Sequence, residues 1–173
     1  MNEATVGAGL DVRNLREFFR DSLHEALVKQ HSSVDDHTEA YVVNLLTMFS
    51  RSEALFEPTP AGPRLRPLAL MLADASEAPT REHRARVLQR LGDVSLFVAG
   101  FFSQGFARRL VDVDYHIAMG GRAYGTLAGA CRDGARGRAL SGVFAELATK
   151  FQRLVDALNE VSEMAHTHDQ RDV

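Results

Sequence analysis

The sequence predicts an all-α fold, a single-domain bundle of five to seven helices around a buried central helix. Apolar residues recur at intervals of three and four along most of the chain, and no segment of useful length alternates like a strand. The third observation is the stretch 91–106, the most apolar of the chain, which must be covered on all sides. It is shorter than the about 20 apolar residues that cross a bilayer, so we expect the central helix of a soluble core.

Length and composition limit the organisation of the chain. With 173 residues, 45% of them apolar, it can fill one core, so we expect a single domain over 1–173 with frayed ends at 1–11 and 166–173. The lone Cys131 excludes an internal disulfide and indicates a reducing compartment. The N-terminal sequence has no basic region followed by an apolar one, so we expect a cytoplasmic protein with no signal peptide and no membrane span.

Two amphipathic helices are expected before the prolines. The first covers about 12–30, with one apolar stripe and with arginines and carboxylates interleaved on its other faces, which we interpret as a solvated surface. The second covers about 36–50 after a polar turn at 31–36. It is apolar around most of its circumference, Tyr41 included. We expect its one polar stripe to face water: His37, Ala40, Asn44, Thr47 and Arg51.

All five prolines lie within residues 58–79 and mark a region of connections. We expect a loop at 57–65 and a short helix at 68–75. The central helix should begin at the N-cap residue Thr80 and continue to about residue 102, so that its second half is the buried run. Gly92 lies where the two halves join, and it indicates either a close neighbouring backbone or a bend.

Two further helices are expected in the C-terminal part. The first, at about 113–131, should be capped by Asp112 or Asp114. It carries a strip of small residues that either packs closely on another helix or forms a dimer contact, with glycines at Gly121, Gly125 and Gly129. The last helix follows the glycine-rich loop 132–138 and ends near residue 165. Its apolar residues repeat at intervals of four and three, so we expect it to pack against the buried half of the central helix.

Searches for catalytic and cofactor motifs return little. The chain has no Walker motif, no dinucleotide-binding glycine pattern, no H-E-x-x-H or C-x-x-C pair and no G-x-S-x-G elbow. Glu163 and His166 have the spacing of a di-metal motif but lie at an end expected to fray, and Asp112 and His116 are better explained as a cap and a half-buried side chain. A haem bound through His116 has no supporting motif. We assign no catalytic residue, metal ligand or cofactor.

The best candidate for a site is a polar cluster beside the apolar run, between the helices expected at 80–102 and 113–131. Its members are Asp93, Arg108, Arg109, Asp112, Asp114, Tyr115, His116, Arg122 and Tyr124. Burying Asp93 without a partner would be costly, so an arginine or a helix N-terminus should neutralise it. Such a cluster either fixes the crossing of the two helices or lines a pocket for a small anion or a metal ion.

Part of this region resembles a known group of sequences. The stretch Gly92-Asp-Val-Ser-Leu-Phe-Val-Ala-Gly-Phe-Phe102, followed by Val111-Asp-Val-Asp-Tyr-His-Ile-Ala-Met-Gly-Gly-Arg-Ala-Tyr-Gly125, is similar to an uncharacterised bacterial family of all-helical proteins. The resemblance includes Tyr41-Val-Val-Asn-Leu-Leu46 and covers most of the chain. It implies a helical fold and brings no assigned function, so no residue role is carried over.

We favour a non-enzymatic cytoplasmic protein that acts through contact with a protein partner or through self-association, since apolar helix surface is abundant and catalytic constellations are lacking. One alternative is a small-anion or metal-binding protein, with or without enzymatic activity, that uses the polar cluster. Another is weak nucleic-acid binding, which the net charge of −3 disfavours. The arginines for such binding are Arg81, Arg84, Arg86, Arg90, Arg108, Arg109, Arg132, Arg136 and Arg138.

Overall fold

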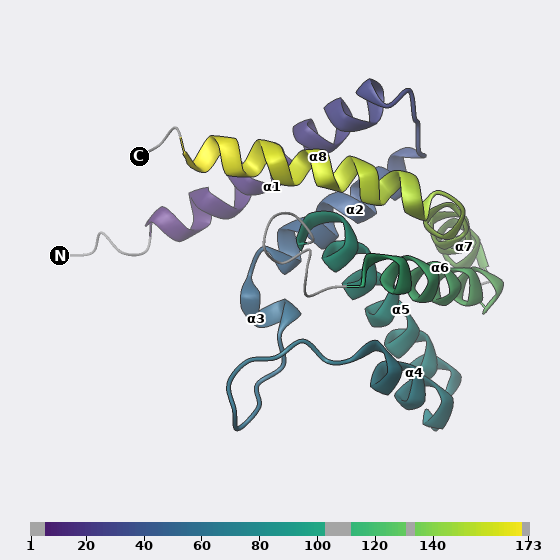
Figure 1. Cartoon of the computed structure of the whole chain (residues 1–173). Helices are drawn as coiled ribbons and strands as arrows, with labels where there is room; N and C mark the ends of the chain where they lie inside the picture. Colours follow the sequence, from purple (N-terminus) through teal and green to yellow (C-terminus); the bar gives the residue numbers. More distant parts are fainter. Residues whose placement is uncertain (1–5, 103–111, 131–133, 171–173) are drawn as a thin grey trace.

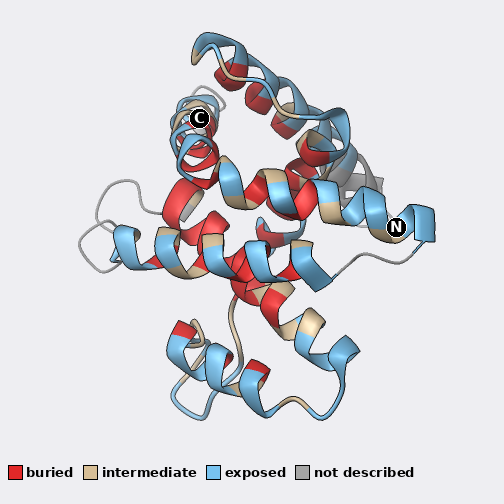
Figure 2. Ribbon diagram, turned by 90° about the vertical axis from the view of Figure 1, so that its right-hand side faces the viewer, coloured by how far each residue is buried: buried red, intermediate tan, exposed pale blue. Residues whose placement is uncertain are grey.

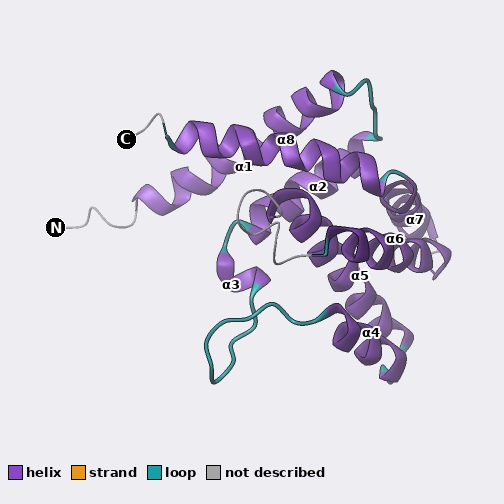
Figure 3. Cartoon of the chain, viewed as in Figure 1, coloured by secondary structure: helices purple, strands orange, loops and turns teal. Residues whose placement is uncertain are grey.

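The computed structural model describes residues 6–102, 112–130 and 134–170, and within them the fold is all-helical (Figures 1 and 3). The only strand-like feature in these ranges is an isolated bridge between Glu57 and Arg64. The elements are α1 (Val6–Lys29), α2 (Asp36–Phe49), α3 (Ser52–Leu55), α4 (Leu68–Glu77), α5 (Arg81–Phe97), the π-helical turn η1 (Val98–Phe102), α6 (Val113–Ala130), α7 (Gly134–Thr149) and α8 (Phe151–Asp169). The predicted all-α class is confirmed.

The described part of the chain holds eight α-helices, so the predicted number of five to seven was too low. One addition is α3, which forms between α2 and the proline loop. The other arises because the predicted last helix is divided at Lys150, whose φ of −103° and ψ of 18° turn α8 away from α7 (Figure 1). Hydrogen bonds continue on both sides of the break, so the apolar spacing of four and three runs through it without interruption. The pattern therefore gave no sign of the break.

The apolar run predicted to form the core is buried at every position from Leu91 to Gly100. These positions form the last part of α5 and the first part of η1. α5 packs between α4 and α6, and η1 packs against α8, so the last helix meets the run as expected. Figure 2 shows buried positions gathered where these helices cross.

Two glycines allow these close crossings. A Cβ atom added to Gly92 would lie 2.6 Å from the ring of Tyr124 on α6. One added to Gly100 would lie 2.6 Å from Cβ of Leu158 on α8. The close neighbour expected at Gly92 is therefore a tyrosine ring rather than a backbone.

α1 and α2 form a helical hairpin at one side of the molecule. α1 packs against α2 and α8, and α2 also contacts α5 and α7. The N-terminal part of α1 and the C-terminal part of α8 lie toward the same side in Figure 1. Because α1 begins at Val6 and α8 ends at Asp169, both helices extend into stretches expected to fray.

Candidate functional site

Asp93 is the centre of a buried polar contact that joins three helices. Its Oδ1 atom on α5 accepts a 2.7 Å hydrogen bond from the Tyr41 hydroxyl on α2 and a 2.6 Å hydrogen bond from the Tyr124 hydroxyl on α6. Gln89 Nε2 donates to the Tyr41 oxygen over 2.9 Å. Asp93 is only 8% exposed. The three side chains therefore tie α2 and α6 to the middle of α5.

The electrostatics of this contact follow from burial. Burial raises the pKa of Asp93 to about 6, although the hydrogen bonds from Tyr124 and Tyr41 and the charge of Arg90 act in the opposite direction. Burial and the neighbouring Asp93 carboxylate raise the pKa of both tyrosines, so both stay protonated and can donate. Asp93 thus changes charge near neutral pH between two neutral donors.

Aromatic packing closes this contact from solvent. The Tyr124 ring is fully buried and stacks on Phe144 at a centroid distance of 6.0 Å, while Phe151 lies at 6.0 Å in a tilted arrangement. Tyr41 meets Phe144 edge-on at 5.8 Å. Asp93 is 8% exposed and one of its oxygens already accepts two tyrosine hydroxyls, so little of the carboxylate is open to a ligand. The geometry supports the structural interpretation of the cluster.

Among the predicted cluster residues that the structure describes, Asp93 and Tyr124 are brought together from two different helices. Asp112, Tyr115 and His116 contact one another only locally, at the start of α6. The expected partner of Asp93 was an arginine or a helix N-terminus, and the observed donors are two tyrosines. Tyr41 was missed because it was counted among the apolar residues of its helix. A buried tyrosine hydroxyl usually has a polar partner, and that was the available signal.

The other described members of the cluster lie elsewhere on α6 and do not converge. Asp114, Tyr115 and Arg122 are exposed, and Asp112 accepts a 3.1 Å hydrogen bond from the Tyr115 amide, which confirms it as the cap. His116 is buried with no partner for Nδ1, and burial lowers its pKa. The remaining predicted members, Arg108 and Arg109, lie outside the described residues.

The glycine strip of α6 is not the site of a tight helix crossing. A Cβ atom added to Gly121 would lie 4.0 Å from the Ala148 carbonyl oxygen, and one added to Gly125 would lie 3.9 Å from Ala148 Cβ, both ordinary contacts. Around Gly129 nothing lies within 4 Å. The close approach on α6 is instead at Gly120, where an added Cβ would lie 2.6 Å from Ser95 Cβ.

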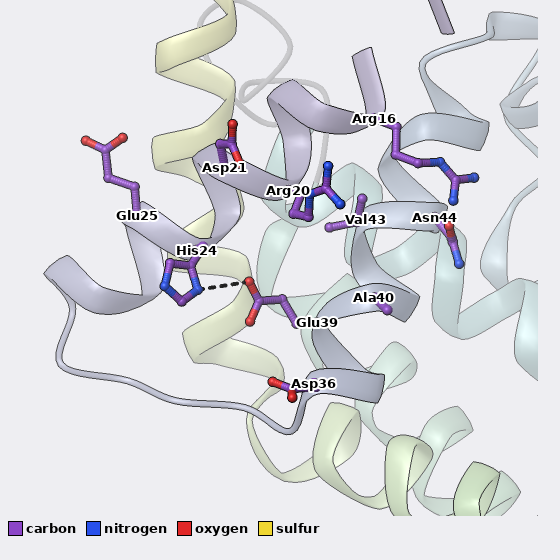
Figure 4. A pocket seen from close by; sticks show the side chains of 10 residues that line it. All are labelled: Arg16, Arg20, Asp21, His24, Glu25, Asp36, Glu39, Ala40, Val43 and Asn44. Carbon is purple, nitrogen blue, oxygen red and sulfur yellow. Dashed lines mark hydrogen bonds and ion pairs between the residues drawn. The ribbon is translucent and has the colours of Figure 1, made fainter. Parts of the chain in front are cut away.

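An open cleft of about 690 Å³ lies between α1 and α2 (Figure 4). Apolar surface from Ala40 and Val43 forms part of its lining. Charged and polar side chains surround that surface: Arg16, Arg20, Asp21, His24, Glu25, Asp36, Glu39 and Asn44. The cleft thus combines an apolar base with groups of both charges.

The two charges are separated along the cleft. Figure 4 shows Arg16 beside Asn44 at one end, Arg20 near the middle with Asp21 next to it, and Glu25 and Asp36 toward the other end, where the Glu25 side chain points away from α2. This separation arises because α1 and α2 run in opposite directions. The arginines of the first half of α1 therefore lie near the C-terminal half of α2, and the acidic N-terminus of α2 lies near the second half of α1.

Most of these charges have no partner within the described part of the chain. The exception is Glu39, whose Oε1 lies 3.2 Å from Nδ1 of His24. No hydrogen bond or ion pair satisfies the side chains of Arg16, Arg20, Glu25 or Asp36 there. Opposite charges around an apolar surface can steer and orient a partner of complementary charge.

A set of long-range hydrogen bonds fixes the turn between α1 and α2. The Asp35 amide donates to Glu146 Oε1 over 2.8 Å, and Lys150 Nζ donates to the Ser33 carbonyl over 2.6 Å and to Glu146 Oε2 over 2.9 Å. Arg153 adds a 3.2 Å bond to the Ser32 hydroxyl. The end of α7 and the start of α8 therefore hold the hairpin, and with it the acidic end of the cleft.

Sequence reasoning missed the cleft, although it described both of its walls. The charged faces of α1 and the polar stripe of α2 were each predicted to be exposed, and Arg16, Arg20, Ala40 and Asn44 are exposed. The prediction was wrong for Thr47 of that stripe, which is buried and donates its hydroxyl to the Val43 carbonyl over 2.8 Å. Neither pattern states that the two faces lie side by side. A short hairpin turn after the first helix was the one available signal, because it makes consecutive helices antiparallel neighbours.

No group of three or more histidine, cysteine or carboxylate residues with metal-binding geometry occurs among the described residues. Within the same part of the chain, no helix has the length and apolar character needed to cross a bilayer. Comparisons of the chain with protein-family models, curated proteins and solved structures gave no match.

Proposed function

We propose that this chain is a non-enzymatic, cytoplasmic protein that acts by contacting a protein partner, and that the cleft between α1 and α2 is its contact surface. In this proposal the helices form one bundle around α5 and η1, and that bundle presents the α1–α2 hairpin. The single cysteine of the sequence supports a reducing compartment.

The observation that carries the proposal is the unpaired charge around an apolar base. Arg16 and Arg20 expose guanidinium groups that no described residue neutralises, and Glu25 and Asp36 expose free carboxylates. A partner with complementary charges would be steered to this surface and held in one orientation. The apolar base would supply the part of the contact that excludes water.

Exposed apolar side chains extend the surface beyond the cleft. Val28 lies one turn beyond His24 on α1 and is 60% exposed, and Met48 lies one turn beyond Asn44 on α2 and is 45% exposed. A small ligand inside the cleft would leave both side chains in water. A protein that covers the hairpin could bury both, and this favours a macromolecular partner.

The alternative of a small-anion or metal site at the predicted polar cluster has less support. Asp93 and Tyr124 are enclosed and satisfy each other, and Asp114, Tyr115 and Arg122 point to separate exposed positions on α6. No specific observation favours nucleic-acid binding. Neither alternative has a surface with the combined features of the cleft.

Position-specific photo-crosslinking tests the proposal. A photoreactive amino acid would replace Asn44 in the cleft or, as a control, the exposed Gln152 on α8, in cells that naturally make the protein. We expect a defined protein adduct from position 44 only. The adduct should disappear in the Arg16→Glu/Arg20→Glu variant, and the purified partner should bind the wild-type chain. Equal adducts from both positions, or none from position 44, would contradict the proposal.

A further inference from the structure

The contact surface has a charge pattern that fits its own copy. Arg16 and Arg20 lie toward one end of the cleft, and Glu25 and Asp36 lie toward the other (Figure 4). A rotation that reverses the long direction of the surface therefore places the basic end over an acidic end. Such reversal is what a twofold axis does when it lies in an interface and runs across the helices.

We propose that the partner at this surface is a second copy of the chain, bound as a twofold dimer in which the two α1–α2 hairpins pack face to face. This inference rests on the proposed function and names its partner. The axis lies in the interface and crosses both helices, so each α1 runs antiparallel to the α1 of the other copy. The same applies to α2.

The surface is complementary in charge to a second copy of itself. In the dimer, the Arg16 end of one copy faces the partner's Glu25 and the partner's Asp36, and the same contact is repeated by symmetry. Each contact between opposite charges therefore occurs twice in the dimer. An unrelated partner would need the reverse pattern of charge at the same spacing, whereas a second copy already has it.

The exposed apolar side chains of the hairpin also fit a second copy. Val28 lies at the acidic end of the hairpin and Met48 lies at the basic end, because α1 and α2 are antiparallel. A face-to-face arrangement of two hairpins covers both ends of each copy. The dimer then buries Ala40 and Val43 at its centre and also covers Val28 and Met48 at its two ends.

The glycine strip of α6 is the other surface at which two copies were considered. Gly125 and Gly129 are exposed and leave room for a neighbouring helix. The strip carries no unpaired charge of its own that would select a partner or fix its direction. The hairpin surface has unpaired charges and a direction set by them, which favours it as the contact between two copies.

A charge-swap experiment tests the dimer. The first variant, Arg16→Glu/Arg20→Glu, reverses the charge of the basic end. The second, Glu25→Lys/Asp36→Lys, reverses the two outer carboxylates of the acidic end and leaves Asp21 and Glu39 unchanged. We expect wild-type chain to dimerise in sedimentation velocity and each variant alone to associate at least about tenfold more weakly, because like charges then meet at the interface. An equimolar mixture of the two variants should dimerise again, since every contact in the mixed dimer is between opposite charges.

Two controls separate this result from general effects of charge or unfolding. The variant Arg84→Glu/Arg122→Glu makes the same change in net charge at exposed positions on α5 and α6, and it should dimerise like wild type. Circular dichroism should show unchanged helix content in all variants. Wild-type dimerisation should also weaken between about 0.1 M and about 1 M salt, where the screening length falls from about 10 Å to about 3 Å.

The outcomes distinguish the dimer from the proposed function. Failure of the mixed variants to associate, or equal weakening by the α5–α6 control, would overturn the dimer. A strictly monomeric wild-type chain whose position 44 crosslinks to a different protein would also overturn the dimer, yet it would support the contact surface. A monomeric chain with no adduct from position 44 would remove both proposals.

Discussion

Tyr124 donates a 2.6 Å hydrogen bond to Asp93, while its ring fills the space that a side chain at position 92 would occupy. One residue of α6 is thus in contact with two consecutive positions of α5, one polar and one without a side chain. The pair fixes the rotation and the separation of two helices at the same point. This makes the Asp93–Tyr124 contact the most informative place to test the fold.

Replacing Tyr124 with phenylalanine should destabilise the protein while preserving its packing. The buried carboxylate of Asp93 would keep only one of its two donors, and losing a hydrogen bond to a charged group costs about 1–3 kcal/mol. Urea denaturation at pH 7 measures the change in the free energy of unfolding. Tyr41→Phe should cost less, since Tyr41 is only partly buried. A Tyr124→Phe variant as stable as wild type would show that the carboxylate does not depend on this donor.

The stability of the protein should depend on pH through Asp93, with a definite sign. Its pKa is about 6 in the folded chain and near the ordinary 3.8 when unfolded, so between these values the folded chain holds the proton more firmly. This group therefore favours folding more as pH falls from about 6 toward 4, and less as pH rises. Wild type should gain stability relative to Asp93→Asn over this window.

Denaturation of wild type and Asp93→Asn at several pH values gives the comparison, because the other titrating groups are common to both chains. In the Tyr124→Phe variant, the pH range over which stability changes should move to higher pH, since a hydrogen bond that lowers the pKa of Asp93 is then lost. If wild type instead lost stability relative to Asp93→Asn on acidification, the burial of a carboxylate at this position would be refuted.

The helical class was predictable because helices repeat their environment every three to four residues. The buried run 91–100, the capping role of Asp112 and the packing of the last helix on the run all follow from local pattern. The break at Lys150 did not follow, since a change of helix direction that skips no residue leaves the apolar spacing intact. Periodicity predicts which face of a helix is buried, but it does not predict where the helix axis changes direction.

The two sites show a different limit. The predicted cluster contained both Asp93 and Tyr124, but it named an arginine or a helix N-terminus as the partner of Asp93. It left out Tyr41, which lies 52 positions from Asp93 on another helix. The cleft was missed for the same reason. Its walls come from two helices, and the exposed face of each helix alone has no feature that predicts a cleft. Packing determines which helices contact one another. A single sequence predicts such a contact only where a short turn joins the two helices or where a buried charge requires a partner.

Two glycine-to-alanine substitutions should have opposite effects. At Gly92 the new Cβ would lie 2.6 Å from the Tyr124 ring, so α5 and α6 would have to separate and the Asp93 contact would be strained. At Gly129 nothing lies within 4 Å, and alanine should stabilise the helix by about 0.5–1 kcal/mol. Thermal denaturation should show a lower midpoint for Gly92→Ala and a higher one for Gly129→Ala. Equal stabilisation of both variants would contradict the close crossing.

Glu146 should control the order of the turn that carries the acidic end of the cleft. Its carboxylate accepts hydrogen bonds from the Asp35 amide and from Lys150, and although burial acts to raise its pKa, these bonds hold that pKa below the ordinary value. A carboxyl with a depressed pKa stabilises the fold above its ordinary pKa and loses that effect as pH falls through the lowered value. Glu146→Ala should therefore accelerate hydrogen exchange at the Asp35 amide, with a smaller change in Glu146→Gln, which keeps one acceptor. The Glu39 amide, which donates to the Asp35 carbonyl at 2.9 Å, serves as an internal reference.

If the hairpin surface forms the dimer, Glu146→Ala should also weaken self-association, although it changes no charge in the cleft. Unchanged exchange at Asp35 would mean that α7 does not hold the hairpin in place.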